Sequence, residues 1–256
     1  MHFSLLKPIH GWRPFIGEIA IIVIGVLIAL GAQQVAENWA WRQKVDDAGR
    51  QLKREASINF RYAAEQVTVG PCLDAQLERL RLRVLASGST LRPAPVFNDP
   101  SSNFVFRSPS RPFQSHIWRA INDDGTGLHF DDLSRYLYSE TYTQLDDLGL
   151  LTKQTDLKTG QLMVLHETIS LDPATRAQLL LAVAEQRSRS RQQSLLAEQV
   201  MGTMRDLKQA PEESVVDQYL LHRSGSVRFC KGHGLPLADW RTTLAKVRPS
   251  TIESLD

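Results

Sequence analysis

The chain has little cysteine and almost no net charge. Among 256 residues there are two cysteines, and 30 Lys plus Arg stand against 28 Asp plus Glu. So few cysteines exclude a disulfide-dense small scaffold, and without a neighbouring histidine cluster they do not complete a four-ligand zinc site. A net charge of +2 gives no general attraction to nucleic acid or to a polyacidic partner. We therefore expect no nucleic-acid partner.

The short motifs that mark common catalytic and nucleotide-binding sites are also missing. The sequence holds no G-x-S-x-G, no P-loop, no G-x-G-x-x-G and no H-E-x-x-H. Ser226, in SGSVRFC, has no identifiable base. We expect no enzymatic activity, no catalytic residue, no metal ligand and no cofactor.

One apolar run departs from an otherwise globular composition of 42% hydrophobic and 23% charged residues. Residues 19–32, IAIIVIGVLIALGA, carry no polar side chain, and residues 15–18 extend the run with Glu18 as its one interruption. As a helix this stretch is roughly 27 Å long, close to the ~30 Å hydrocarbon core of a bilayer. With Val35 and Ala36 added, it predicts a transmembrane helix over 15–36, after a short segment 1–14.

Tryptophans flank the run on both sides. Trp12 precedes it, Trp39 and Trp41 follow it, and the helical distance of roughly 40 Å between them matches a bilayer with its headgroups. They are predicted interfacial anchors in a lipid bilayer. A buried core helix and a cleavable signal peptide are the alternatives. The helical pattern continues beyond Ala32 with no break for a protease, which favours an uncleaved signal anchor.

The same segment carries a resemblance. Gly17-Glu18-Ile19, the run GVLIAL at 25–30, Gln33-Gln34 and a later tryptophan follow one another in that order. This resembles the membrane segment of small bacterial single-pass proteins in families of unknown function, which read G-E-I, an apolar run, G-[IV]-L-I-A-L, two amides and then Trp. Here the amides are Gln rather than Asn, and Val35 stands where the aromatic usually follows. The resemblance covers about residues 15–41 and implies a membrane-anchored bacterial protein without an assigned activity.

Helical spacing gives the predicted span one face of mostly small residues. Gly25 and Ala29 form a small-xxx-small pair on this face, which lets two helix backbones approach closely. The face predicts a homo-oligomer through the membrane helix, although small residues are common in membrane helices in any case. The members of this membrane-helix face are Glu18, Ile22, Gly25, Ala29 and Ala32.

The flanking charges give conflicting indications of orientation. Lys7 and Arg13 precede the span, whereas Arg42, Lys44, Arg50, Lys53 and Arg54 follow it, and a positive-inside count therefore favours a cytoplasmic C-terminus. The long tail of residues 37–256 is of the kind that translocates regardless of such charges. We favour a cytoplasmic N-terminus and an extracytoplasmic tail, in the cytoplasmic (inner) membrane of a bacterial envelope.

Cysteine usage bears on the same question. Cys72 and Cys230 are an even pair 158 positions apart, and in an oxidising compartment such a pair is expected to close. In the chain-entropy model a loop of this length gains roughly 4–5 kcal/mol of stability when it is closed. The alternative is two separate thiols. The sequence has no C-x-x-C redox motif.

The remainder of the chain predicts an all-α soluble part. Apolar positions recur at helical spacing from 33 to 67, so the membrane helix continues as a stalk, and Gly70-Pro71 is expected to end it before an antiparallel helix at 72–86. Residues 87–112 hold five of the twelve prolines and predict a long loop, either a strap packed on the bundle or a partner-binding loop.

A helical bundle is predicted over 113–248, followed by a tail at 249–256, because no window alternates with period two. Asp131 or Asp132 can cap a long helix, kinked near Gly149 or Gly160, and Asp172-Pro173 can begin its antiparallel partner. The expected helices are 113–122, a long one from about 133, 174–207, 212–222 and 237–247, with a turn at 123–127.

Three clusters of polar residues could bind a metal ion or an anion. The turn 122–127 resembles an EF-hand loop but has Leu133 at its twelfth position, so a capping turn is expected. His222, Cys230 and His233 could meet Cys72, yet a disulfide would use the thiols that zinc needs. The other histidines, His116, His129 and His166, stand alone. The run QRSRSRQQS carries Arg187, Arg189 and Arg191 at steps of two, which predicts a solvated segment rather than one cationic face.

These patterns favour a structural or interaction protein: a single-pass anchor with an extracytoplasmic helical domain that contacts itself or envelope partners. A small-ligand sensing domain that signals through a partner protein is the alternative. A pocket with converging polar groups would favour the second interpretation, and a filled core with exposed apolar patches the first.

Overall fold

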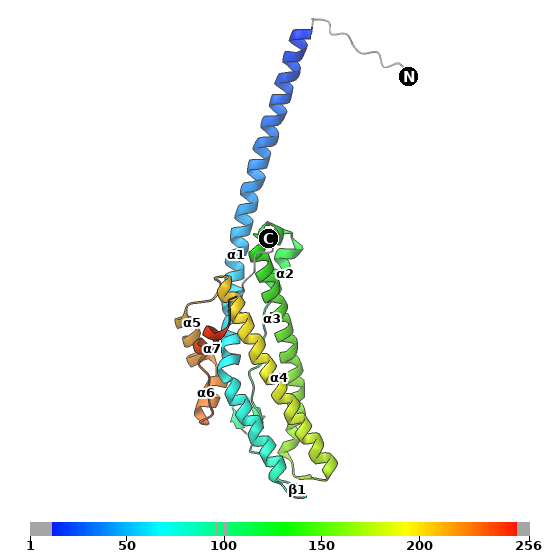
Figure 1. Cartoon of the computed structure of the whole chain (residues 1–256), viewed down its shortest axis with the longest axis vertical. Helices are drawn as coiled ribbons and strands as arrows, with labels where there is room; N and C mark the ends of the chain where they lie inside the picture. Colours follow the sequence, from blue (N-terminus) through cyan, green and yellow to red (C-terminus); the bar gives the residue numbers. More distant parts are fainter. Residues whose placement is uncertain (1–11, 96, 100–101, 250–256) are drawn as a thin grey trace, which may run out of the picture. The chain divides into compact units, whose positions relative to one another are not determined.

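A computed structural model describes the backbone of residues 12–95, 97–99 and 102–249, and the side chains of residues 15–95, 97 and 104–249 (Figure 1). Lys7 and nearly all of the predicted tail 249–256 lie outside the described residues, as do the side chains of Trp12 and Arg13. The chain divides into a short N-terminal unit up to Ala48 and a domain from Gly49 onward. In the described part, helices dominate and the few strands have two or three residues each, so the all-α prediction is confirmed.

The first helix, α1 (Trp12–Ala86), contains the apolar run. Its most apolar 18-residue window has a mean hydropathy of 2.6 and none of that window is buried, so the helix is long and apolar enough to cross a membrane. This is compatible with a membrane anchor. Large side chains along the run, such as Ile21 at 72% exposed and Ile28 at 67%, are uncovered.

The predicted helix break at Gly70-Pro71 is wrong, and with it the antiparallel course of 72–86. Helix α1 continues through Pro71 to Ala86. Pro71 faces outward, so its ring displaces no core side chain. A proline disturbs the carbonyls of the preceding turn, and the Thr68 carbonyl accepts a bond from the Ala238 N–H at 2.9 Å. Gly70 permits a close neighbour, because a Cβ there would lie 3.0 Å from Ser194 Oγ.

Three long helices form the frame of the domain. They are α1 from Gly49 onward, α3 (Asp132–Thr159) and α4 (Pro173–Asp206). Helix α4 is antiparallel to α3 and to α1, because Gln186 bonds Thr159 while Gln193 bonds Thr152, and Arg187 bonds Asp74. Figure 1 shows α3 and α4 as the long hairpin. The apolar core includes Leu73, Leu77, Phe106, Leu162, Leu165 and Val183.

The predicted starts of α3 and α4 are confirmed, whereas the helices predicted from 113 and 237 begin at His116 and Trp240, and the predicted end of the long helix is wrong. Asp131 caps α3 by accepting the Ser134 N–H at 2.9 Å, and Asp172 caps α4 ahead of Pro173. Helix α3 runs past Gly149 and gives way at Gly160 to a 3-10 helix, η2 (Gly160–His166). The helical pattern was expected to continue to Ile169, but Ile169 and Ser170 form the strand β4 (Ile169–Ser170), because they pair with a strand of the proline-rich segment.

The proline-rich segment contains short strands that the sequence did not predict. β1 (Thr90–Leu91) pairs antiparallel with β4, and β2 (Phe97–Asp99) pairs with β3 (Ser102–Phe104). Several side chains of the segment are buried, including Leu91, Val105 and Phe106. It is therefore a strap packed on the domain, as one of the two interpretations of this loop predicted.

Short elements complete the domain. After the strap come α2 (His116–Asp123) and the 3-10 helix η1 (Thr126–His129). After α4 come α5 (Glu213–Gln218), a π-helical turn η3 (Tyr219–Arg223), α6 (Gly225–Gly232) and α7 (Trp240–Lys246). The sequence prediction missed α6, which Ser224 caps by accepting the Val227 N–H at 2.9 Å.

Candidate functional site

A buried carboxylate, Glu65 on α1, joins three separate segments of the domain. Its side chain is 0% exposed. One oxygen accepts from Arg111 Nε at 2.6 Å and from the Tyr219 hydroxyl at 2.7 Å. The other accepts from Arg111 Nη2 at 2.9 Å and from the Ser224 hydroxyl at 2.6 Å. Glu65 thus links the strap, η3 and the cap of α6, and all four of its strong acceptor positions are used.

The surroundings of Glu65 fix its partners in one protonation state. The hydrogen bonds that Arg111 donates to Glu65 raise the pKa of Arg111, so the guanidinium stays charged. Burial, and then the neighbouring Glu65 carboxylate, raise the pKa of Tyr219, so its hydroxyl remains a donor. The cluster is therefore an ion pair between Glu65 and Arg111, to which the neutral hydroxyls of Tyr219 and Ser224 also donate hydrogen bonds.

Polar side chains of α1 also hold the strap through its backbone. Asn59 donates to the Gln114 carbonyl at 2.7 Å and accepts from the Gln114 N–H at 2.9 Å. Gln76 binds both backbone groups of Arg107 in the same way, at 3.1 and 2.9 Å. These paired bonds satisfy backbone N–H and C=O groups at positions where the segment does not pair with another strand. They also fix the position of the segment on α1.

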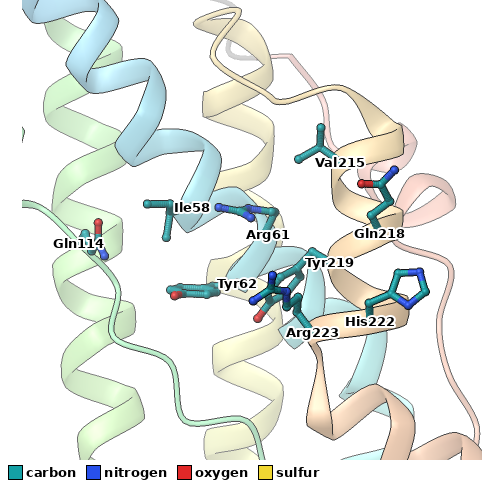
Figure 2. A pocket seen from close by; sticks show the side chains of 9 residues that line it. All are labelled: Ile58, Arg61, Tyr62, Gln114, Val215, Gln218, Tyr219, His222 and Arg223. Atoms are coloured by element: carbon teal, nitrogen blue, oxygen red, sulfur yellow. The ribbon is translucent and has the colours of Figure 1, made fainter.

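An open groove lies between α1 and the segment α5–η3, next to the Glu65 cluster. Its volume is about 680 Å³, inside the range of small-molecule sites. Figure 2 shows Ile58, Arg61 and Tyr62 on α1 facing the residues of α5 and η3, with Gln114 of the strap at one side. The lining residues are Ile58, Arg61, Tyr62, Gln114, Val215, Gln218, Tyr219, His222 and Arg223.

The groove is cationic and partly aromatic. It is lined by two arginines, a histidine and two tyrosines, and no acidic side chain contributes to the lining. The Arg61 guanidinium lies over the Tyr219 ring at 5.6 Å, and the Tyr62 ring meets Phe113 edge-on at 6.0 Å. Among these residues the sequence pattern pointed only to His222, as a possible zinc ligand.

The structure forms the predicted disulfide between Cys72 and Cys230, whose Cα atoms are 6.0 Å apart. Both cysteines are buried, at 0% and 1% exposed. The bond uses the thiols of the zinc grouping that was weighed, while His233 packs on Phe229 and His222 lines the groove. The EF-hand-like turn is a capping turn, in which Thr126 N donates to Asp124 Oδ1 at 2.9 Å.

The expected solvated arginine run is wrong in part. Arg187 donates to both oxygens of Asp74 at 2.6 Å and to Glu78 at 2.7 Å, and Arg191 donates to Asp74 at 2.9 Å. Arg187 and Arg191 are four residues apart, about one helical turn, so they lie on the same edge of α4, where α4 packs against α1. Arg189 bonds Gln154 of α3 instead.

This ion network gives a pH-dependent prediction. The hydrogen bond from Arg187 lowers the pKa of Asp74 below 3.8, although burial opposes it. Asp74 therefore adds stability at pH values above 3.8 and loses that contribution as the pH falls through its lowered pKa. Because the side chains are partly exposed, we expect Asp74→Asn to cost about 1 kcal/mol or less at pH 7. Urea unfolding at neutral pH and in acid measures this difference, with the exposed Asp147→Asn as the control. An equal cost at both pH values would contradict the prediction.

The membrane-helix face lies in the N-terminal unit. Helix α1 places Glu18, Ile22, Gly25, Ala29 and Ala32 at helical spacing, and each is exposed. A Cβ added at Gly25 would meet no described atom within 4 Å. Of the predicted anchors, Trp39 is 63% exposed and Trp41 lies under Lys44 Nζ at 4.6 Å.

Comparisons with known proteins identify no relative of this chain. No family model matches it, and neither a curated protein nor a solved structure is significantly similar. Its functional interpretation therefore depends on its own residues.

Proposed function

We propose that the chain is a single-pass protein of the cytoplasmic membrane whose helical domain lies outside the cytoplasm and acts by contacting itself or other envelope proteins. The observation that carries the proposal is the buried Cys72–Cys230 bond, which lies downstream of the candidate membrane helix. Disulfides persist in oxidising compartments and are rare in the cytosol. A domain that contains one is therefore expected on the exported side of the anchor.

Reporter fusions at the C-terminus test the sidedness. We expect a fusion to alkaline phosphatase to be active and a fusion to green fluorescent protein to be dark. The control joins the same reporters after residue 14, before the apolar run, where the pattern should reverse. A fluorescent C-terminal fusion without phosphatase activity would overturn the proposal.

The membrane-helix face supports self-association as part of this role. Gly25-xxx-Ala29 offers a flat surface on which a second helix can pack closely. We expect Gly25→Ile to reduce dimerisation several-fold in a membrane reporter assay, because the larger side chain separates the backbones. Gly31→Ile, on another face of the same helix, is the matched control. Equal signals from wild type and Gly25→Ile would refute the association face.

A small-ligand sensing role is the second candidate. The observation that favours it is the groove beside Glu65, where polar groups from α1, the strap and η3 converge. In this role the domain would bind a ligand outside the cytoplasm and signal through a partner protein. The Glu65 cluster supplies a physical connection, since it holds the strap and η3 together.

A further inference from the structure

We infer that the groove between α1 and η3 is a binding site for a small organic anion, one that carries an acidic group on a flat apolar body. The inference rests on the ligand-sensing role and adds the chemical class of the ligand. Three observations carry it: unpaired cationic groups, a π-helical turn and an aromatic wall.

The cationic groups of the groove have no carboxylate partner in the part of the chain that the structure describes. Arg61 uses its Nε to bond the Ser57 carbonyl at 3.0 Å, and its two terminal nitrogens make no described hydrogen bond. The Arg223 side chain makes no hydrogen bond or ion pair with any described residue. Other arginines of the domain are paired with acids, among them Arg81, Arg111, Arg119, Arg187 and Arg241. Two guanidinium groups without an acidic partner in one groove favour a ligand with a carboxylate or phosphate.

The buried carboxylate of Glu65 does not cancel this charge. Glu65 lies behind the groove, is fully buried and is paired with Arg111, which is not a lining residue. The pair is neutral as a whole, so Arg61 and Arg223 set the sign of the charge in the groove. An anionic ligand would meet these positive groups without a repelling acid in the lining.

The turn that presents Arg223 is a π-helix, Tyr219–Arg223. Such turns are rare and occur frequently at functional sites, because the wider turn changes which side chains share a face. Here Tyr219, His222 and Arg223 all line the groove, while the Tyr219 hydroxyl bonds Glu65 at 2.7 Å. The bond fixes the Tyr219 ring, so this part of the wall is formed before a ligand arrives.

The remaining lining suits an apolar body. The Tyr62 and Tyr219 rings lie 6.0 Å apart with an angle of 54° between their planes, and Figure 2 shows Ile58 and Val215 near the rim of the groove. Aromatic walls with a few placed polar groups are typical of small-molecule sites. Gln114 and Gln218 can orient the ligand by hydrogen bonds.

Calorimetric titration of the full chain in phosphatidylcholine nanodiscs tests the inference. The probes are phenyl phosphate, phenylacetate, inorganic phosphate and uncharged benzyl alcohol. We expect both aromatic anions to bind at one site, inorganic phosphate to bind at least about tenfold more weakly, and benzyl alcohol not to bind. Because a charge-assisted hydrogen bond is lost, Arg61→Gln and Arg223→Gln should each weaken binding of the aromatic anions by about tenfold or more.

Arg79→Gln is the matched control, since Arg79 is exposed on α1 away from the groove, and it should bind as wild type does. Circular dichroism confirms that each variant is folded. Absence of saturable binding by both aromatic anions, or unchanged affinity in the two groove variants, would overturn the inference. If inorganic phosphate bound as tightly as phenyl phosphate, the inference that the ligand carries an apolar body would be wrong. Binding of benzyl alcohol would leave the ligand-sensing role in place and would refute the requirement for an anionic ligand. The reporter fusions test export separately.

Discussion

Replacing Glu65 with alanine is expected to destabilise the domain by about 3–5 kcal/mol, the usual cost of removing one partner of a buried ion pair. The substitution leaves Arg111 charged and partly buried, and it deprives the Tyr219 and Ser224 hydroxyls of their acceptor. Unfolding in urea, followed by the fluorescence of the buried Trp118 and Trp240, measures the loss in the full chain.

Two further variants distinguish the cost of leaving a buried charge unpaired from the cost of truncating any side chain on α1. Glu78→Ala removes a partly exposed ion-pair partner from the same helix and should cost much less stability than Glu65→Ala. A double variant, Glu65→Leu with Arg111→Leu, removes both charges and should recover a substantial part of the stability. If Glu65→Ala costs no more than Glu78→Ala, the Glu65 cluster does not hold the strap and η3 in the way we describe.

Loss of the disulfide is expected to have the second largest effect. The Cys72→Ala, Cys230→Ala double variant should lose about 2–5 kcal/mol, because it frees a loop of 158 residues in the unfolded chain. Locally, the bond ties α6 to α1 in the core, since Cys230 is only 1% exposed. The midpoint of urea unfolding, with and without a reductant, is the measurement.

The reductant supplies the control for this prediction. Wild type should shift toward the stability of the double variant when it is reduced, whereas the double variant should not respond. If reduction of the thiols is verified and the midpoint of wild-type unfolding does not change, the disulfide contributes little stability.

Features with strong local signals could be predicted from sequence. The apolar run at 15–36 is long and hydrophobic, so a helix able to cross a membrane could be predicted from length and hydropathy. Asp131 and Asp172-Pro173 predicted the starts of α3 and α4, because a capping carboxylate and a first-turn proline act within three residues. The even cysteine pair likewise indicated its disulfide.

Features decided by distant contacts could not be predicted. Gly70-Pro71 is a helix-breaking signal locally, yet here Ala238 bonds the Thr68 carbonyl and Gly70 admits Ser194 of α4. Both partners lie more than a hundred positions away in the sequence. β1 likewise depends on a distant partner, since Thr90 pairs with Ser170 of β4.

The candidate site was missed for a related reason. Glu65 meets Arg111, Tyr219 and Ser224, and the sequence separations to these partners run from 46 to 159. One signal was nevertheless present: Asn59, Glu65 and Gln76 are polar residues among the apolar positions of α1, and all three are buried. Polar residues on the core face of a helix need partners. They indicate that a polar segment, here the strap, must cross the helix.

Labelling of a single introduced thiol in whole cells tests the central claim, export of the domain, most directly. Ser188→Cys places an exposed thiol on α4, and Ser4→Cys, ahead of the apolar run, is the control for the opposite side. A membrane-impermeant maleimide should label Ser188→Cys equally in intact and in lysed cells, and should label Ser4→Cys only after lysis. Labelling of Ser188→Cys only after lysis would contradict export of the domain.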